Sequence, residues 1–168
     1  MSRATKTMCF CAAALALALV GCSGQNPLTT THVNQEASLG GALPSGPLQG
    51  QVITSWIDSR DGTMSTLLGN DVAVRYARTN SGHAYPAGAA LTLATWTQAE
   101  DGRWFGARIP AAAKSVEFVT IGLDANHQAA YSYQKYEGAP LRRVSAMELG
   151  AADERISFLI SQRAAVMP

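Results

Sequence analysis

Residues 89–123, with the sequence AALTLATWTQAEDGRWFGARIPAAAKSVEFVTIGL, decide the fold. This stretch contains apolar runs of strand length at 89–97, 103–109 and 115–123. Leu91 and Leu93 alternate with small or polar residues, which is the two-residue period of a half-buried strand. Asp101-Gly102 supplies a turn after the first run, and Pro110 separates the second run from the third. The stretch therefore predicts consecutive strands of an antiparallel sheet.

The segment before this stretch predicts two further strands and a helix. Residues 51–58 contain Val, Ile and Trp side chains and predict either a strand or a short helical segment. A turn then leads to a second strand at residues 64–68. Asn70 or Asp71 caps a helix over residues 71–78, where apolar residues recur at helical spacing.

The C-terminal part predicts two short strands and a second helix. Tyr131 and Tyr133 share one face of an aromatic strand, and residues 142–147 add another strand. Residues 151–166 carry an apolar stripe at helical spacing, with Asp153 as the expected N-cap. Strands joined by tight turns and flanked by two helices predict an α+β fold, in which a single domain has an antiparallel β-sheet with flanking helices.

The N-terminus has the parts of an export signal. Basic residues at positions 3 and 6 precede an apolar run from Met8 to Val20, which at 13 residues is too short to cross a bilayer. Leu19-Val20-Gly21-Cys22 resembles a bacterial lipobox. We interpret residues 1–21 as a lipoprotein signal peptide, removed before Cys22, whose thiol then carries a diacylglycerol. Two or three acyl chains on one residue give stable membrane anchoring.

The lipid on Cys22 places the mature protein in the cell envelope. Ser23 follows the cysteine, and no acidic residue stands there to suggest retention at an inner membrane, so we expect attachment to the outer membrane, facing the periplasm. Residues 22–47 are rich in Ser, Gly, Asn, Thr and Pro and predict a lipidated cysteine followed by a flexible tether. The globular domain is then expected over residues 48–168.

Charge and cysteine content exclude several classes of function. Without the signal peptide, 11 Lys+Arg face 12 Asp+Glu, so there is no electrostatic case for nucleic acid or for an anionic lipid surface. Cys22 is the only cysteine left, which excludes an internal disulfide and a cysteine-ligated metal site.

Catalytic and metal-binding motifs are absent from the sequence. It contains no Gly-x-Ser-x-Gly elbow, no phosphate loop, no Rossmann fingerprint and no His-Glu-x-x-His. His32, His83 and His127 lie far apart in the chain and predict ordinary loop positions, although convergence of His83 with His127 in space stays open. The sequence therefore predicts no catalytic residue, no cofactor-binding residue and no metal ligand.

The run at 103–109 contains the residues most typical of a binding site. Trp104 and Arg108 are expected on one strand face beside Gly106, and Glu117 on the next strand is positioned to pair with Arg108. A guanidinium group binds carboxylates in a fork and stacks on aromatic rings, so Trp104, Arg108 and Glu117 form a candidate pocket for a carboxylate or a flat ligand. The simpler interpretation is a cross-strand ion pair beside core aromatics.

Three patches of sequence carry a resemblance to a known family: Leu68–Ala73, Tyr85–Ala89 leading into Leu91 and Trp96, and Val116–Val119. They resemble the cytochrome P-460 family, which includes hydroxylamine-oxidising enzymes and the related beta-sheet cytochromes c-prime. The resemblance covers about Leu67 to Pro168. It implies an antiparallel sheet with flanking helices around a c-type haem, often in a homodimer.

The haem-binding residues of that family are missing from this chain. The family attaches haem through Cys-x-x-Cys-His near its C-terminus, and the corresponding positions here are Val144–Glu148. The lysine that cross-links to the porphyrin in the enzymes corresponds to Leu93. No functional residue carries over, and covalent haem is excluded because no cysteine follows Cys22. Non-covalent haem through His83, His127, Met147 or a tyrosine stays open.

The sequence therefore predicts a membrane-anchored lipoprotein with a haem-free, P-460-like domain that acts as a binding or structural module. Its expected partner is membrane lipid, through Cys22, with a homodimer as a further option. An enzyme or sensor that uses the vacated pocket for a small molecule is the alternative, as is a non-covalent haem protein.

Overall fold

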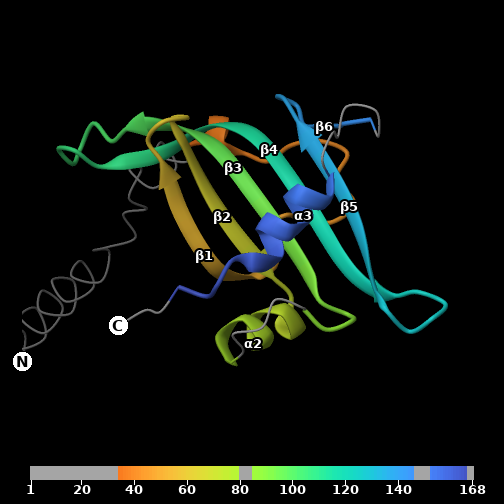
Figure 1. Cartoon of the computed structure of the whole chain (residues 1–168). Coiled ribbons are helices and arrows are strands. Elements are labelled where there is room, and N and C mark those ends of the chain that lie inside the picture. The colour runs from red at the N-terminus through yellow and green to blue at the C-terminus, as the bar shows by residue number, and fades with distance from the viewer. Residues whose placement is uncertain (1–33, 80–84, 146–151, 166–168) are drawn as a thin grey trace, which may run out of the picture. The chain divides into compact units, whose positions relative to one another are not determined.

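Six β-strands form one antiparallel sheet in the order β1-β2-β3-β4-β5-β6, so each strand pairs with its neighbours in the chain (Figure 1). The computed structural model describes residues 34–79, 85–145 and 152–165. The strands are β1 Gln51–Asp58, β2 Thr63–Gly69, β3 Ala90–Glu100, β4 Arg108–Leu123, β5 Ala129–Glu137 and β6 Arg142–Arg143. The helices are η2 Gln35–Ala37, a 3-10 turn, α2 Asp71–Thr79 and α3 Ala152–Ser161.

This architecture confirms the predicted α+β fold with an antiparallel sheet and flanking helices. Residues 51–58 form a strand, which decides between the two options that the sequence left open there. The predicted signal peptide, Cys22, His32, His83 and Met147 lie outside the described residues. No helix within the described part of the chain is both long and apolar enough to cross a membrane.

The run at 103–109 was predicted as a strand, and this prediction is wrong for residues 103–107, while Arg108 and Ile109 begin β4. Residues 101–107 form the turn between β3 and β4, closed by hydrogen bonds from Trp104 N to Asp101 O (3.3 Å) and from Ala107 N to Trp104 O (3.0 Å). Gly106 has φ of +77°, which favours glycine and suits a turn rather than a strand. The turn chemistry of Asp101 and Gly106 therefore outweighs the apolar content of the run.

β4 continues without a break through Pro110, which was expected to separate two strands. Proline lacks the N–H that a strand with two neighbours needs. β5 pairs only with residues 115–123 of β4, so Pro110 lies where β3 is the only partner strand, close to a register shift between β3 and β4. At that position the N–H group that Pro110 lacks costs the sheet little stability.

Asn70 rather than Asp71 caps α2. The Asn70 side-chain oxygen accepts hydrogen bonds from Ala73 N (3.0 Å) and from Ala90 N (3.2 Å), so one residue holds both the helix start and the first residue of β3. The Asp71 carboxylate instead accepts a hydrogen bond from Gln51 Nε2 at 2.8 Å.

α3 is shorter than the predicted helix over 151–166. It ends at Ser161, and Ala165 N then donates a hydrogen bond of 2.8 Å to Ile53 O on β1. The helix therefore ends before Ala165, whose N–H group binds a carbonyl group of β1 instead. Asp153 lies inside the first turn, where its charge suits the helix dipole, and is not the cap. The predicted apolar stripe holds for Ile156 and Leu159, which are both buried.

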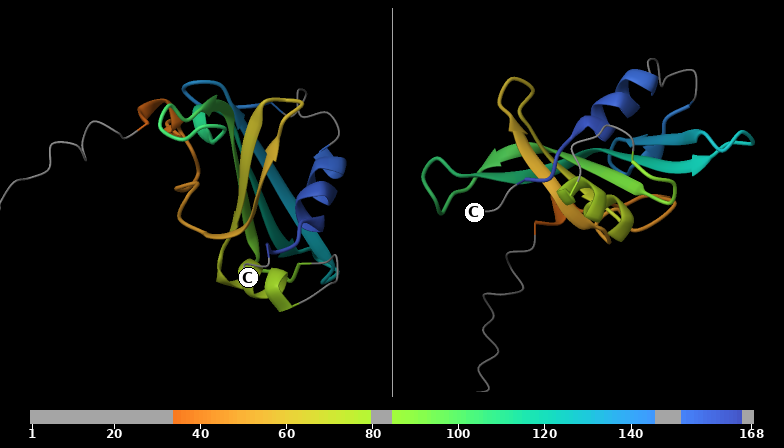
Figure 2. Two further views of the ribbon diagram at one scale, coloured as in Figure 1. Left: turned by 90° about the vertical axis from the view of Figure 1, so that its left-hand side faces the viewer. Right: turned by 60° about the horizontal axis from the view of Figure 1, so that its bottom comes forward.

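The two faces of the sheet carry separate apolar clusters. Side chains alternate along a strand, so Val119 and Ile121 of β4 point to the α3 face while Val116 and Phe118 point to the other. The α3 face holds the largest cluster, made of Ile53, Leu67, Ala73, Val74, Tyr85, Ala89, Leu91, Leu93, Val119, Ile121, Ile156 and Leu159. Figure 2 shows the sheet between α3 and the segment that begins at residue 34.

Residues 34–47 pack on the sheet, whereas the sequence predicted a flexible tether up to residue 47. The folded unit begins at Asn34. Trp96 Nε1 donates to Ala37 O at 2.8 Å, and Leu39 and Leu43 pack against the buried Phe118 cluster. These few apolar side chains cover sheet surface that would otherwise meet water, and this burial offsets the entropy of ordering a polar segment.

A substitution at Leu67 tests whether the core lies on the α3 face of the sheet. Leu67 is fully buried in the cluster on the α3 face. We expect Leu67→Ala to lower the free energy of unfolding in urea by about 2–5 kcal/mol, because the substitution leaves a cavity. Val52→Ala on the neighbouring strand is the control, since Val52 is 53% exposed and should change stability by less than about 0.5 kcal/mol. Equal effects of the two substitutions would contradict this core.

Candidate functional site

A hollow of about 510 Å³ lies on the α3 face, toward the end of the sheet that carries the β1–β2 turn. We call it the Glu117 cleft. It is lined by Trp56, Asp58, Asp61, Thr63, Ser65, Thr95, Lys114, Ser115, Glu117, Lys135, Glu137, Arg155 and Phe158. Strands β1 to β5 and helix α3 all contribute to it, so the cleft exists only in the folded domain.

Hydroxyl groups form the floor of the cleft. Thr63, Ser65, Thr95 and Ser115 are each less than a tenth exposed. Ser65 pairs with Thr95 across β2 and β3, and Thr95 pairs with Ser115 across β3 and β4. The hydroxyls of Ser65 and Thr95 are 3.0 Å apart. The row therefore continues the face of Leu67 and Leu93 with polar groups in place of apolar ones.

Glu117 is the buried charge of the cleft. Its side chain is 2% exposed, and its carboxylate is bound in a fork by Arg155, with Nε to Oε2 and Nη2 to Oε1 both at 2.7 Å. Tyr133 donates its phenolic hydroxyl to Oε2 at 2.6 Å. Two parallel charged hydrogen bonds fix both the orientation and the distance of a guanidinium group. The interaction joins β4, β5 and α3 at one point.

The electrostatics of these three residues are coupled. The hydrogen bond to Glu117 raises the pKa of Arg155, which is opposed by the partial burial of the guanidinium group. Burial raises the pKa of Tyr133 well above its ordinary value of 10.0, and its hydrogen bond to Glu117 and the negative charge of that carboxylate raise it further. Tyr133 therefore keeps its proton at neutral pH and acts as a donor to the carboxylate.

Aromatic rings form one wall of the cleft. Trp56 and Phe158 meet edge to face, with ring centroids 6.0 Å apart and an interplanar angle of 81°. The Arg155 guanidinium carbon lies 4.8 Å from the centroid of the Phe158 ring, within the range of a cation–π contact. Phe158 therefore supports Arg155 from one side while Glu117 binds it from the other.

Charged groups form the rim. Lys135 Nζ and Glu137 Oε1 are 2.6 Å apart, and both side chains are partly exposed. The Asp58 carboxylate accepts the backbone N–H groups of Arg60 and Asp61, at 2.9 Å and 3.1 Å, and so orders the β1–β2 turn. Lys114 lines the same rim. The cleft thus presents both signs of charge above a neutral hydroxyl floor.

The structure does not bring together the three residues that the sequence suggested as a pocket. Glu117 lies in the cleft, but Arg108 pairs with Glu100 at 3.3 Å, and Trp104 is 70% exposed on the β3–β4 turn. The expected pair between Arg108 and Glu117 is wrong because both residues belong to β4, nine positions apart, or about 30 Å along a strand.

Arg155 and Tyr133 are site residues that the sequence analysis did not identify. One signal could have pointed to them. Glu117 stands at every second position with Val119 and Ile121, on a face that is otherwise apolar. A carboxylate on a buried face requires a cation and further donors. The sequence does not tell which cation, because Arg155 lies 38 residues away.

The residues of the Glu117 cleft do not fit a haem group. Among the described residues that line it, none is a His, Met, Cys or Tyr that could serve as an axial ligand. The hydroxyl group of Tyr133 is already bound to the Glu117 carboxylate. His127 lies in the β4–β5 turn, beyond Leu123 at the far end of β4, roughly 20 Å from Glu117 at the rise of a strand. Leu93, at the position of the cross-linking lysine in the resemblance, is buried in the core.

Metal ligation is not supported either. Within the part of the chain that the structure describes, no three His, Cys, Asp or Glu side chains are grouped so that they could hold a metal ion.

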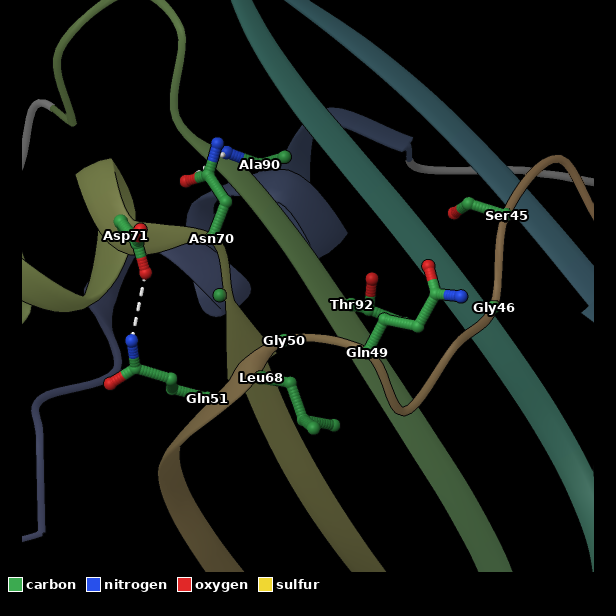
Figure 3. A pocket seen from close by; sticks show the side chains of 11 residues that line it. Ser45, Gly46, Gln49, Gly50, Gln51, Leu68, Asn70, Asp71, Ala90 and Thr92 are labelled. Carbon is green, nitrogen blue, oxygen red and sulfur yellow. Dashed lines mark hydrogen bonds between the residues drawn. The ribbon is translucent and has the colours of Figure 1, made fainter.

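A second hollow, of about 410 Å³, lies at the other end of the sheet near the start of α2 (Figure 3). Three of its polar side chains, those of Asn70, Gln51 and Asp71, already stabilise the fold. Asn70 caps α2 and donates to Gly88 O at 2.8 Å, while Gln51 binds Asp71. It contains no buried charged side chain. The Glu117 cleft is therefore the better candidate for a ligand site.

The pair of Glu117 and Arg155 predicts an asymmetric loss of stability. We expect Arg155→Met to cost about 3–5 kcal/mol in urea unfolding, because it leaves a buried carboxylate without its cation. We expect Glu117→Gln to cost less, about 1–3 kcal/mol, since the Arg155 side chain is 38% exposed and can reach water. The double variant should be more stable than Arg155→Met alone.

Lys135→Met is the matched control, because it breaks the partly exposed pair with Glu137 and should cost less than about 1 kcal/mol. An Arg155→Met variant as stable as this control would show that the buried pair does not join α3 to the sheet.

Comparison with known proteins adds no homologue to these observations. The chain matches no protein-family model, and no curated protein is similar to it in sequence. Its function is therefore inferred from the chemistry of its own residues.

Proposed function

We propose that this chain is a lipoprotein of the bacterial cell envelope whose domain binds a small polar ligand in the Glu117 cleft, without haem. The observation that carries the proposal is the buried carboxylate of Glu117, fixed by Arg155 and Tyr133 beside a row of buried hydroxyls. A buried ion pair is weak evidence for stability, and a hydrophobic replacement is often as stable. A polar hollow at this position therefore supports a binding role.

The lining indicates the chemistry of the ligand. Hydroxyl groups such as those of Thr63 and Ser115 both donate and accept hydrogen bonds, while Lys114 and Asp58 offer one charge of each sign. The rings of Trp56 and Phe158 provide an apolar wall. A small ligand with several hydroxyl or amide groups and one apolar face, such as a monosaccharide or an amino acid, matches this combination.

The family resemblance supports the same proposal. In this interpretation the domain has a P-460-like fold that has lost its haem chemistry and kept a concave sheet face. The patches that carry the resemblance fall at the junction of β2 and α2, at the start of β3 and in the middle of β4. The last patch includes Glu117 itself. The cytochrome activity is not part of the proposal, because its thiols and axial histidine are missing.

A ligand screen with a floor variant tests the binding role. We expect at least one monosaccharide or amino acid in a panel to raise the melting temperature of the full mature chain, because a ligand stabilises the state that binds it. Thr95→Val removes a floor hydroxyl and should weaken that binding at least tenfold by calorimetry. Thr92→Val, on the other face of β3, should not change it.

A panel in which no compound raises the melting temperature would count against a binding role and leave the structural module as the function. Equal losses for Thr95→Val and Thr92→Val would locate binding outside the cleft.

The lipid anchor has a separate test. Export of the full chain in a bacterial host should yield a mature protein that begins at Cys22 and carries a diacylglycerol and an amide-linked acyl chain, visible as added mass. Cys22→Ala should abolish the added lipid mass and keep residues 1–21, because lipid attachment and cleavage require the thiol. Wild-type protein that carries no added lipid mass would refute the anchor.

A further inference from the structure

The turn between β3 and β4 exposes two large aromatic side chains to solvent. Trp104 is 70% exposed and Phe105 is completely exposed, which makes them the most exposed large hydrophobic residues of the described chain. Exposed neighbouring aromatics on a soluble surface commonly mark a contact with a partner or a membrane. The Glu117 cleft does not include either ring.

Hydrogen bonds order the backbone of the turn that carries these two side chains. Arg103 N donates to the Asp101 carboxylate at 2.9 Å, and Ala107 N donates to Trp104 O at 3.0 Å. Asp101 N binds Ala107 O at 3.0 Å and closes the base of the loop. The backbone is therefore hydrogen-bonded on both sides of the two rings, so these rings are presented on an ordered tip.

The folded unit begins beside the base of the same hairpin. The side-chain amide of Asn34 donates to Pro110 O, three residues beyond the turn. η2 follows directly, and Trp96 on the adjoining part of β3 donates to Ala37 O. In the left view of Figure 2 this first segment of the unit, in orange, lies at the end of the sheet that carries the β3–β4 hairpin.

The length of chain before Asn34 limits how far this end of the sheet can lie from the anchor. Twelve peptide steps separate Cys22 from Asn34. A chain of that length spans at most about 40 Å when fully extended. If Cys22 carries its lipid, the hairpin tip is thus held within reach of the same bilayer.

We propose that Trp104 and Phe105 insert into the interface of the membrane that holds the Cys22 lipid and form a second point of attachment. Tryptophan is favoured at the boundary between lipid headgroups and acyl chains, since its ring is apolar and its N–H is polar. Arg103 directly precedes the two aromatic residues in the turn, where its guanidinium group can contact headgroup phosphates.

The net charge of the hairpin tip indicates whether its attachment to the membrane requires anionic lipids. Arg108 pairs with Glu100, and residues 100–108 contain two acidic and two basic side chains, so the tip is close to neutral. Attachment therefore depends on burial of the rings and does not require anionic lipid. The inference rests on the lipid anchor of the proposed function and does not depend on the ligand of the Glu117 cleft.

Fluorescence quenching by brominated lipid tests the contact. The mature lipidated chain is reconstituted into phosphatidylcholine vesicles whose acyl chains are brominated near the headgroup. We expect quenching of the tryptophan emission, and Trp104→Phe should remove most of it, because Trp56 and Trp96 are held within the domain. Phe105→Ser keeps the fluorophore in place and should reduce the quenching at least twofold.

Leu123→Ser is the control, because Leu123 is 56% exposed at the opposite end of β4 and should leave quenching unchanged. Lipidated wild-type protein that is quenched no more than Trp104→Phe overturns the inference. A blue-shifted Trp104 emission without quenching, together with a doubled mass in sedimentation, would identify a second copy as the partner and also overturn it.

Two further readouts separate this inference from the proposed function. A Cys22 thiol without lipid, seen by mass, overturns the anchor and the inference together. Normal quenching in a protein that binds no compound of the ligand panel supports the inference and refutes the binding role alone.

Discussion

The position of α3 on the sheet depends on one buried interaction, the fork between the Arg155 guanidinium and the Glu117 carboxylate. A carboxylate with 2% exposure is costly to bury unless cationic and neutral donors satisfy it. Arg155 and Tyr133 do so from α3 and β5, and this requirement brings the C-terminal helix onto the sheet at a defined position. Ile156 and Leu159 on the same helix then pack into the apolar cluster, so polar and apolar contacts specify one arrangement of α3.

The position of the charge divides the α3 face into two parts. On the side of α2, residues such as Leu91 and Ile121 form the core, and stability comes from apolar burial. On the other side, Ser65, Thr95 and Ser115 continue the same face of their strands with polar side chains and line a polar hollow. On the opposite face, Ala37, Leu39 and Leu43 of the N-terminal segment pack against the sheet. One sheet thus supports a core, a cleft and the attachment of the N-terminal segment.

Much of the local structure could be predicted because its causes lie close together in the sequence. The alternation of Leu91 and Leu93 predicted β3, and Asn70 was one of two residues named as the cap of α2. The failures have a common cause. Trp104 and Phe105 made residues 103–109 resemble a strand by composition, but Asp101 and Gly106 form a hydrogen-bonded turn. The composition of a segment indicates which side chains prefer to be buried, but a turn can still leave apolar rings exposed to solvent.

The sequence by itself predicted an antiparallel sheet, because short turns join most of its strand-like runs. It also determined that covalent haem is excluded, since no cysteine follows Cys22. The pairing of β2 with β3 was decided by the tertiary structure, since α2 lies between these strands in the chain. Only the tertiary structure decided that Glu117 binds Arg155 and not Arg108, and that the chain from Asn34 lies on the sheet. Both choices join segments that are distant in the chain, and a side chain's partner is set by distance in space, which local sequence does not encode.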